Sequence, residues 1–169
     1  MDYNKIITEL ERNKDVFSKL LSGLPKAQYL WKANPEKWCL LEICCHLHDE
    51  EREDFRTRTK YVLENPHLPL PTFDPAKWVM DRAYIQQDFD RVLDNFLKER
   101  EKSVEWLQSL INPKWDNAFN HPKFGKMTAE LFLTNWLAHD YLHMRQILNL
   151  KFDYLDQLTK EPLTYAGNW

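Results

Sequence analysis

Two histidines, His139 and His143, stand four residues apart in the middle of a strongly apolar stretch. If that stretch is helical, one turn places both imidazoles on the same face. This is the spacing with which two histidines of one helix chelate a single metal ion. A pair of core histidines, each hydrogen-bonded to a neighbour, is the alternative. The two interpretations carry about equal weight, because two unpaired imidazoles are costly to bury.

A third ligand has to come from another segment, and the stretch that contains His46 and His48 offers one. Two residues apart on a helix, these side chains point in nearly opposite directions, so only one of them faces the interior. His46 follows Ile43 by about one turn on the apolar side, and we therefore take His46 as the ligand. His48 shares a face with Cys44. That pair is a rival zinc site, but it lacks obvious third and fourth partners.

Carboxylates lie close to these histidines. Asp140 invites comparison with the glutamate of H-E-x-x-H proteases, but its side chain is one methylene shorter and the third histidine lies upstream. We interpret Asp140 as a group that orients an imidazole or as a residue hydrogen-bonded within the protein interior. Glu42, Asp49 and Glu50 lie near the face of His46 and are candidates for a fourth ligand or a proton acceptor. A solvated acidic helix face explains Asp49 and Glu50 equally well.

The other histidines and several aromatic residues have simpler interpretations. His67 and His121 fall in proline-containing loops, where a solvated imidazole is expected. A pocket lining and a core stripe explain three of the aromatic residues equally well: Trp78, Tyr84 and Trp136.

Four long helices are predicted to position these residues, with no strand signal between them. The first spans Tyr3 to Leu21, and the second spans about Leu40 to Leu63. The third begins between Asp81 and Asp88 and ends before Pro113. The fourth is capped by Thr128 and ends at about Leu150. The third helix has an apolar stripe that Arg100 interrupts: Ile85, Phe89, Val92, Phe96, Val104 and Leu107. A helical turn is expected around Gln28 to Leu30, and proline-containing loops are expected at residues 66–75 and 113–125. The fold class is therefore all-α, a four-helix bundle.

The last helix differs from the others, because only Asp140 and Arg145 carry full charge between Leu131 and Leu150. We therefore expect most of its circumference to be buried.

Composition and charge indicate which classes of protein this chain does not resemble. The 169 residues are expected to form one domain, 1–169, and the net charge of -3 gives no electrostatic reason to expect nucleic acid binding. The N-terminus lacks the pattern of a signal peptide, and no apolar run approaches the length of a membrane span. Of three cysteines, Cys44 and Cys45 are adjacent, and adjacent cysteines rarely pair. These observations predict a cytoplasmic protein with reduced thiols and no membrane partner.

Two motifs carry a family resemblance. The residues from Trp38 to Glu51, WCLLEICCHLHDEE, resemble the W-S-x-x-E-I-x-x-H-L-x-D-x-E stretch of the DinB/YfiT-like metalloprotein superfamily. The residues from His139 to Ile147, HDYLHMRQI, resemble that family's H-D-x-x-H-x-x-Q-I. Residues 74–79 and 165–169 are similar to further, less specific segments of the family. The resemblance implies a four-helix bundle in which three histidines hold a metal, and these map onto His46, His139 and His143.

Cys39 departs from the family pattern, in which a serine or threonine usually begins the second helix three residues before a glutamate, here Glu42. A thiol is a poor cap, so this helix start is expected to be less well fixed. A cysteine at a helix N-terminus can also have a lowered pKa and line the mouth of a pocket. A neutral substitution without a role remains the preferred interpretation.

Three imidazoles suit zinc, nickel, copper or ferrous iron better than magnesium or calcium. We expect one zinc or nickel ion, with iron or manganese as alternatives. Three protein ligands leave a position open for water or substrate, which is the pattern of a catalytic site. The resemblance implies transfer or hydrolysis on a small molecule, with a low-molecular-weight thiol as a co-substrate, and it allows a homodimer. The alternative is a non-catalytic stress-response protein in which the ion staples helices together.

Overall fold

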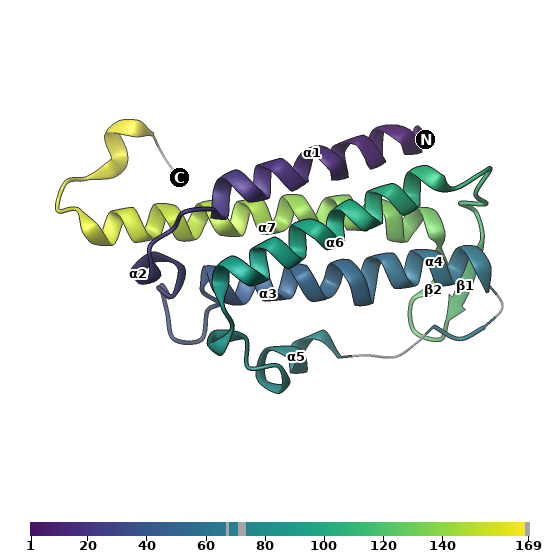
Figure 1. Ribbon diagram of the computed structural model, residues 1–169, viewed down its shortest axis with the longest axis horizontal. Helices are drawn as coiled ribbons and strands as arrows, with labels where there is room; N and C mark the ends of the chain where they lie inside the picture. The colour runs from purple at the N-terminus through teal and green to yellow at the C-terminus, as the bar shows by residue number, and fades with distance from the viewer. Residues whose placement is uncertain (67, 71–73, 168–169) are drawn as a thin grey trace.

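A computed structural model describes residues 1–66, 68–70 and 74–167, and four helical rods lie side by side in it (Figure 1). The rods are α1 (Tyr3–Leu21), α3 (Leu40–Asp49) continued by η1 (Glu50–Phe55) and α4 (Arg56–Glu64), α6 (Phe89–Ser109), and α7 (Ala129–Leu158). α1 and α7 run in one direction, whereas α3–α4 and α6 run in the other. The predicted four-helix bundle is confirmed. The π-helical segment η1 within the second rod was not predicted.

Short helices occupy the connections. α2 (Lys26–Tyr29) confirms the predicted turn before the second rod, and η3 (Leu163–Ala166) follows α7. α5 (Pro75–Asp81) and η2 (Tyr84–Gln86) fill a connection that was predicted to be irregular, and Pro75 occupies the first helical position, where its missing N–H costs little. Ile85 lies in η2, outside α6, and is 46% exposed, so its assignment to the apolar stripe was wrong.

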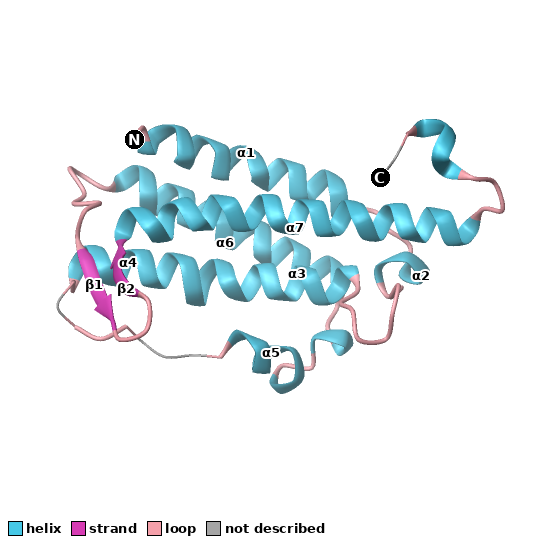
Figure 2. Ribbon diagram, turned by 180° about the vertical axis from the view of Figure 1, so that it is seen from behind, coloured by secondary structure: helices cyan, strands magenta, loops and turns pink. Residues whose placement is uncertain are grey.

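A β-hairpin precedes α7, where the sequence predicted only a loop. β1 (Ala118–His121) pairs antiparallel with β2 (Gly125–Thr128), at the end of the bundle where α7 begins (Figure 2). Gly125 has a φ of 72°, a left-handed conformation that glycine adopts without strain at this turn. The hairpin leads directly into the cap of α7, because Thr128 Oγ1 accepts a hydrogen bond of 3.0 Å from the Leu131 amide. The predicted cap is confirmed.

α7 spans 30 residues and ends at Leu158, later than the predicted Leu150. The expectation that most of its circumference is buried was wrong, because Tyr141 is 49% and Leu142 is 55% exposed. Its buried face carries Trp136, Asp140, His143, Ile147 and other core residues. The apolar character of α7 therefore overstates its burial. None of the helices in the described ranges combines the length and the low polarity that a membrane span requires.

A buried ionic network joins the rods at the level of Arg100. The Arg100 guanidinium donates to both carboxylate oxygens of Asp140 at 2.7 Å and to Glu51 at 2.9 Å. Asn13 Nδ2 donates to Asp140 at 2.9 Å, and the indole N–H of Trp136 donates to Glu51 at 2.9 Å. Arg100 is only 1% exposed. The residue that interrupts the apolar stripe of α6 thus links α1, η1, α6 and α7.

The acidic run that begins at Asp49 is buried. Asp49 accepts hydrogen bonds from the Tyr84 hydroxyl at 2.7 Å and from Arg52 at 2.9 Å, and Glu50 and Glu51 are also buried. The interpretation of Asp49 and Glu50 as a solvated face was therefore wrong. Trp78, Tyr84 and Trp136 are buried core residues.

Candidate metal centre

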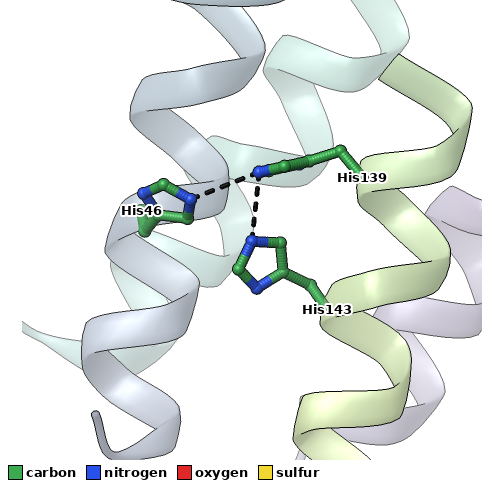
Figure 3. Close-up of side chains that lie close together, drawn as sticks. All are labelled: His46, His139 and His143. Atoms are coloured by element: carbon green, nitrogen blue, oxygen red, sulfur yellow. Dashed lines mark hydrogen bonds between the residues drawn. The ribbon is translucent and has the colours of Figure 1, made fainter. Parts of the chain in front are cut away.

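Three histidine side chains from two antiparallel helices point toward one another (Figure 3). The Nε2 atoms of His46 and His139 are 3.3 Å apart, and those of His143 and His139 are 3.0 Å apart. One ligand atom from each of the three lies within 4.8 Å of the others, and no second cluster of three potential ligands occurs among the described residues. The structure therefore brings together the three histidines that were predicted from the sequence, His46, His139 and His143, which we call the triad.

The local sequence explains this convergence. His46 lies in α3 and faces α7, in the same buried run as Ile43 and Leu47. His139 and His143 are one turn apart on α7, and His143 is on its buried face. The ring of Phe55 lies 4.9 Å from that of His139, and the ring of Trp38 lies 4.8 Å from that of His46. These aromatic contacts shield the sides of the imidazoles and leave their Nε2 atoms directed at a common point.

The environment keeps the three imidazoles neutral. Burial, followed by repulsion from His143, lowers the pKa of His46 to about 3. Burial and the two neighbouring imidazoles lower the pKa of His139 to about 2, and burial also lowers the pKa of His143. A neutral imidazole offers the lone pair that a metal ion requires.

The separations of His139 Nε2 from the other two Nε2 atoms fit a shared divalent metal ion. Two zinc–nitrogen bonds of about 2.05 Å at a tetrahedral angle place their nitrogens about 3.3 Å apart. The observed separations of 3.3 Å and 3.0 Å are close to that value. His143 Nδ1 lies 2.9 Å from Gln146 Oε1, so Nδ1 carries the proton and Nε2 is free to coordinate. The donor set is thus oriented for one ion.

Among the described residues, Glu50 is the acidic candidate that lies beside the triad. Its Oε1 lies 3.9 Å from His46 Nδ1, which is buried without a hydrogen-bond partner. Burial and the nearby Asp54 raise the pKa of Glu50 to about 8. Glu42 binds Lys32 at 2.9 Å instead.

The other two carboxylates are engaged elsewhere. Asp49 binds Tyr84 and Arg52, as described above, and also pairs with Arg82 at 2.7 Å. Asp140 binds Arg100 and Asn13, which matches the prediction that it is hydrogen-bonded within the bundle. A role for Asp140 in catalysis stays a prediction.

The remaining predicted candidates lie away from the triad. Cys44 is fully buried and, with His48, belongs to no cluster of three potential ligands in the described ranges. His121 ends strand β1, and its Nδ1 accepts hydrogen bonds from the backbone amides of Lys123 and Phe124. His67 lies outside the described residues, as do the last two residues of the C-terminal segment of the resemblance, 168–169.

Cys39 is buried, and it does not have the properties of a reactive helix-terminal thiol. Burial raises the pKa of Cys39 to about 11, so the alternative of a lowered pKa was wrong, and the preferred interpretation of a neutral substitution stays a prediction. The helix start is nevertheless held, because Glu42 accepts a hydrogen bond of 2.9 Å from the Cys39 amide.

Two neighbours of the triad were assigned no role from the sequence. Gln146 fixes the tautomer of His143, and its position three residues further along the helix is the signal that could have identified it. Phe55 packs on His139 from η1, and no sequence pattern predicts that contact.

In metal-free protein, His139→Gln is expected to make the free energy of unfolding less sensitive to acid. The pKa of His139 is 6.5 in an ordinary environment and about 2 in the folded protein. Between these values the unfolded chain binds the extra proton, so stability falls as the pH falls, by about 1.4 kcal/mol per unit. From pH 7 to pH 5, wild type should therefore lose about 2 kcal/mol more than the variant. Urea unfolding in the presence of a chelator measures this difference.

Glu50 acts in the opposite sense, because its pKa is raised and its contribution is lost as the pH rises. It is present in both proteins, so it cancels in the comparison. Equal acid sensitivity of wild type and His139→Gln would contradict the prediction.

The sequence and the fold of this chain were compared with those of known proteins. A family model described as the DinB superfamily matches residues 9–147, a span that contains all three histidines. None of the curated proteins compared with the chain matches it. Among solved structures, the chain is similar to YfiT from Bacillus subtilis, described as a probable metal-dependent hydrolase with an unusual four-helix bundle topology. The TM-score is 0.77 at 19% identity, over 88% of this chain and 85% of that one, and this likeness establishes the fold.

Proposed function

The chain belongs to the DinB superfamily, as its histidine motifs suggested, and from that premise we propose that it is a metal-dependent enzyme acting on a small molecule. His46, His139 and His143 hold one divalent transition metal ion, zinc or nickel before iron or manganese. The observation that carries the proposal is the convergence of three neutral imidazoles on one point, with two of their Nε2 separations close to those around a tetrahedral ion. Isolated core histidines turn toward separate partners, whereas these three turn toward one point.

The reaction class is hydrolysis or transfer of a group to a low-molecular-weight thiol. A divalent ion with an open position polarises the atom that binds it and lowers the pKa of a bound water or thiol. Both reactions use a nucleophile of this kind. The description of YfiT as a probable metal-dependent hydrolase supports the hydrolytic alternative.

The residues around the triad hold it in one arrangement. Gln146 keeps the proton of His143 on Nδ1, and the rings of Trp38 and Phe55 exclude water from the sides of two imidazoles. Glu50 lies beside His46 Nδ1, where its carboxyl group can accept that N–H after a small movement. The coordinating nitrogens of the three histidines are therefore already oriented before a reaction begins.

A non-catalytic protein in which the ion staples α3 to α7 is the alternative. The hydrogen bonds of Arg100 already connect α7 to η1, which continues the α3 rod. A metal ion that only connected these two helices would therefore add little. This favours the enzyme. Cobalt substitution distinguishes the two, because an open site changes its visible spectrum when azide is added and a saturated site does not.

Elemental analysis of untagged protein tests the metal site. Wild type should contain about one zinc or nickel ion per chain, and His46→Ala, His139→Ala and His143→Ala should each retain less than about a tenth of it. His48→Ala and His121→Ala are matched controls and should keep the metal. The same proteins are then assayed for ester hydrolysis and for thiol transfer. Full activity in triad variants that have lost the metal would refute the proposed function.

A further inference from the structure

A groove of about 420 Å³ lies beside the triad, where η1, the first turns of α7 and the β-hairpin meet. Its lining is mostly apolar and comes from all three elements. The apolar residues are Phe55, Phe124, Met127, Leu131 and Phe132. Phe124 is 64% exposed, so much of this apolar surface is open to a ligand. A volume of this size suits a small molecule.

The groove lies next to the triad, although none of the three histidines lines it. Leu131 and Asn135 line it and precede His139 on α7 by eight and four residues, so the three side chains follow one face of that helix. Phe55 belongs to both places, because it lines the groove and its ring lies 4.9 Å from the ring of His139. A molecule bound against the ring of Phe55 therefore lies near His139.

The groove also carries one uncompensated positive charge. Lys126 lines it, is exposed and makes no ion pair within the described residues. Asp54, the acidic residue of the lining, pairs with Arg58. The neighbouring Lys123 does not line the groove, and its Nζ lies 5.3 Å from the centre of the Phe124 ring. An anionic group on the ligand would complement Lys126.

Two other hollows lined by described residues lack this combination. The larger, about 810 Å³, is lined by the start of α1, the end of α6 and the segment that follows it, and contains none of the triad. Another, about 330 Å³, is lined by polar residues such as His48, Arg52 and Arg82, and Asp49 and Glu53 already bind these arginines. The volume of a hollow therefore does not by itself identify the substrate site; its position beside the triad and its lining do.

We propose that this groove is the substrate-binding subsite of the enzyme and that it takes a small molecule with an aromatic or branched aliphatic group next to a carboxylate or similar anion. The proposal rests on the proposed function, which supplies the reaction centre next to the groove. The apolar group occupies the surface between Phe55 and Phe124, and the anion faces Lys126. Specificity for the substrate then comes from the hairpin and η1, whereas the chemistry comes from α3 and α7.

Two fluorescent probes test this assignment: 8-anilinonaphthalene-1-sulfonate, which is aromatic and anionic, and the uncharged N-phenyl-1-naphthylamine. Phe124→Ser and Leu131→Asn should each weaken binding of both probes about tenfold. Lys126→Gln should weaken only the sulfonate, by about threefold, as expected for an exposed ion pair. Titrations monitored by probe fluorescence give the dissociation constants.

Matched variants control for general surface effects. Lys123→Gln removes a charge from the same hairpin, and Ile111→Ser removes an apolar side chain that is 88% exposed and outside the groove. Both should bind the two probes as wild type does. Dissociation constants that are equal across all variants, or weakened equally by the controls, would overturn the groove as a binding site.

Copper distinguishes a failure of this inference from a failure of the proposed function. Cu²⁺ in the triad should quench the fluorescence of sulfonate bound to wild type, because such quenching requires proximity. His46→Ala should abolish the quenching and keep the dissociation constant. If the affinities follow the predicted pattern and no quenching occurs, the groove stands and the metal centre fails. If copper binds and the affinities do not change, the metal centre stands and the groove fails.

Discussion

Replacing Arg100 by methionine is expected to lower the free energy of unfolding by about 3–5 kcal/mol, the cost of breaking a buried ion pair from one side. Its five N–H groups all have partners: Asp140 twice, Glu51 twice and the carbonyl of Leu10. Burial alone would lower the pKa of Arg100, but Glu51 and Asp140 outweigh it and raise that pKa. Methionine fills much of the volume and leaves two carboxylates buried without a counter-ion.

Urea denaturation followed by circular dichroism measures this loss. Arg91→Met is the matched control, because Arg91 lies on the same helix, is exposed and should tolerate the change. Adding Glu51→Gln and Asp140→Asn to Arg100→Met should recover part of the stability, because the uncompensated charges are then gone. If Arg100→Met proved as stable as Arg91→Met, the network would not hold the rods together.

Zinc is expected to raise the free energy of unfolding of the metal-free protein by up to about 4 kcal/mol when free zinc exceeds its dissociation constant a thousandfold. The three histidines that we propose as its ligands are assembled only in the folded state. The gain has an upper limit because histidines and cysteines of the unfolded chain also bind zinc. His139→Ala removes the central imidazole, whose Nε2 contacts both others, and should abolish most of the gain.

Thermal and urea unfolding in zinc-buffered and chelator-containing solutions provide the measurement. His48→Ala should gain as much as wild type, because His48 lies outside the triad. A gain that survives in His139→Ala and disappears in His48→Ala would place the zinc site at the rival histidine instead.

The sequence was informative where the relevant signal is local. Apolar periodicity located the four rods, and the spacing of His139 and His143 predicted their common face. The choice of His46 over His48 followed from helix geometry and agrees with the structure.

Features that depend on distant partners could not be predicted in this way. Arg100 was recognised only as an interruption, because its carboxylate partners lie 49 and 40 residues away. The acidic run from Asp49 looks solvent-exposed in the sequence, because the distant residues that neutralise it, Arg82 and Arg100, are brought beside it only by the fold. The hairpin before α7 is also missed, because its strands have four residues each and no clear alternation.

The histidine triad also bears on how the chain folds. Ninety-three residues separate His46 from His139, so the segment between them must be closed before their nitrogens can meet. Contacts of such long range form late in folding when the local helices have formed first. An ion that needs all three nitrogens should therefore bind after the transition state. We expect zinc to slow the unfolding rate and to leave the folding rate nearly unchanged, so that metal uptake reports the completion of the fold.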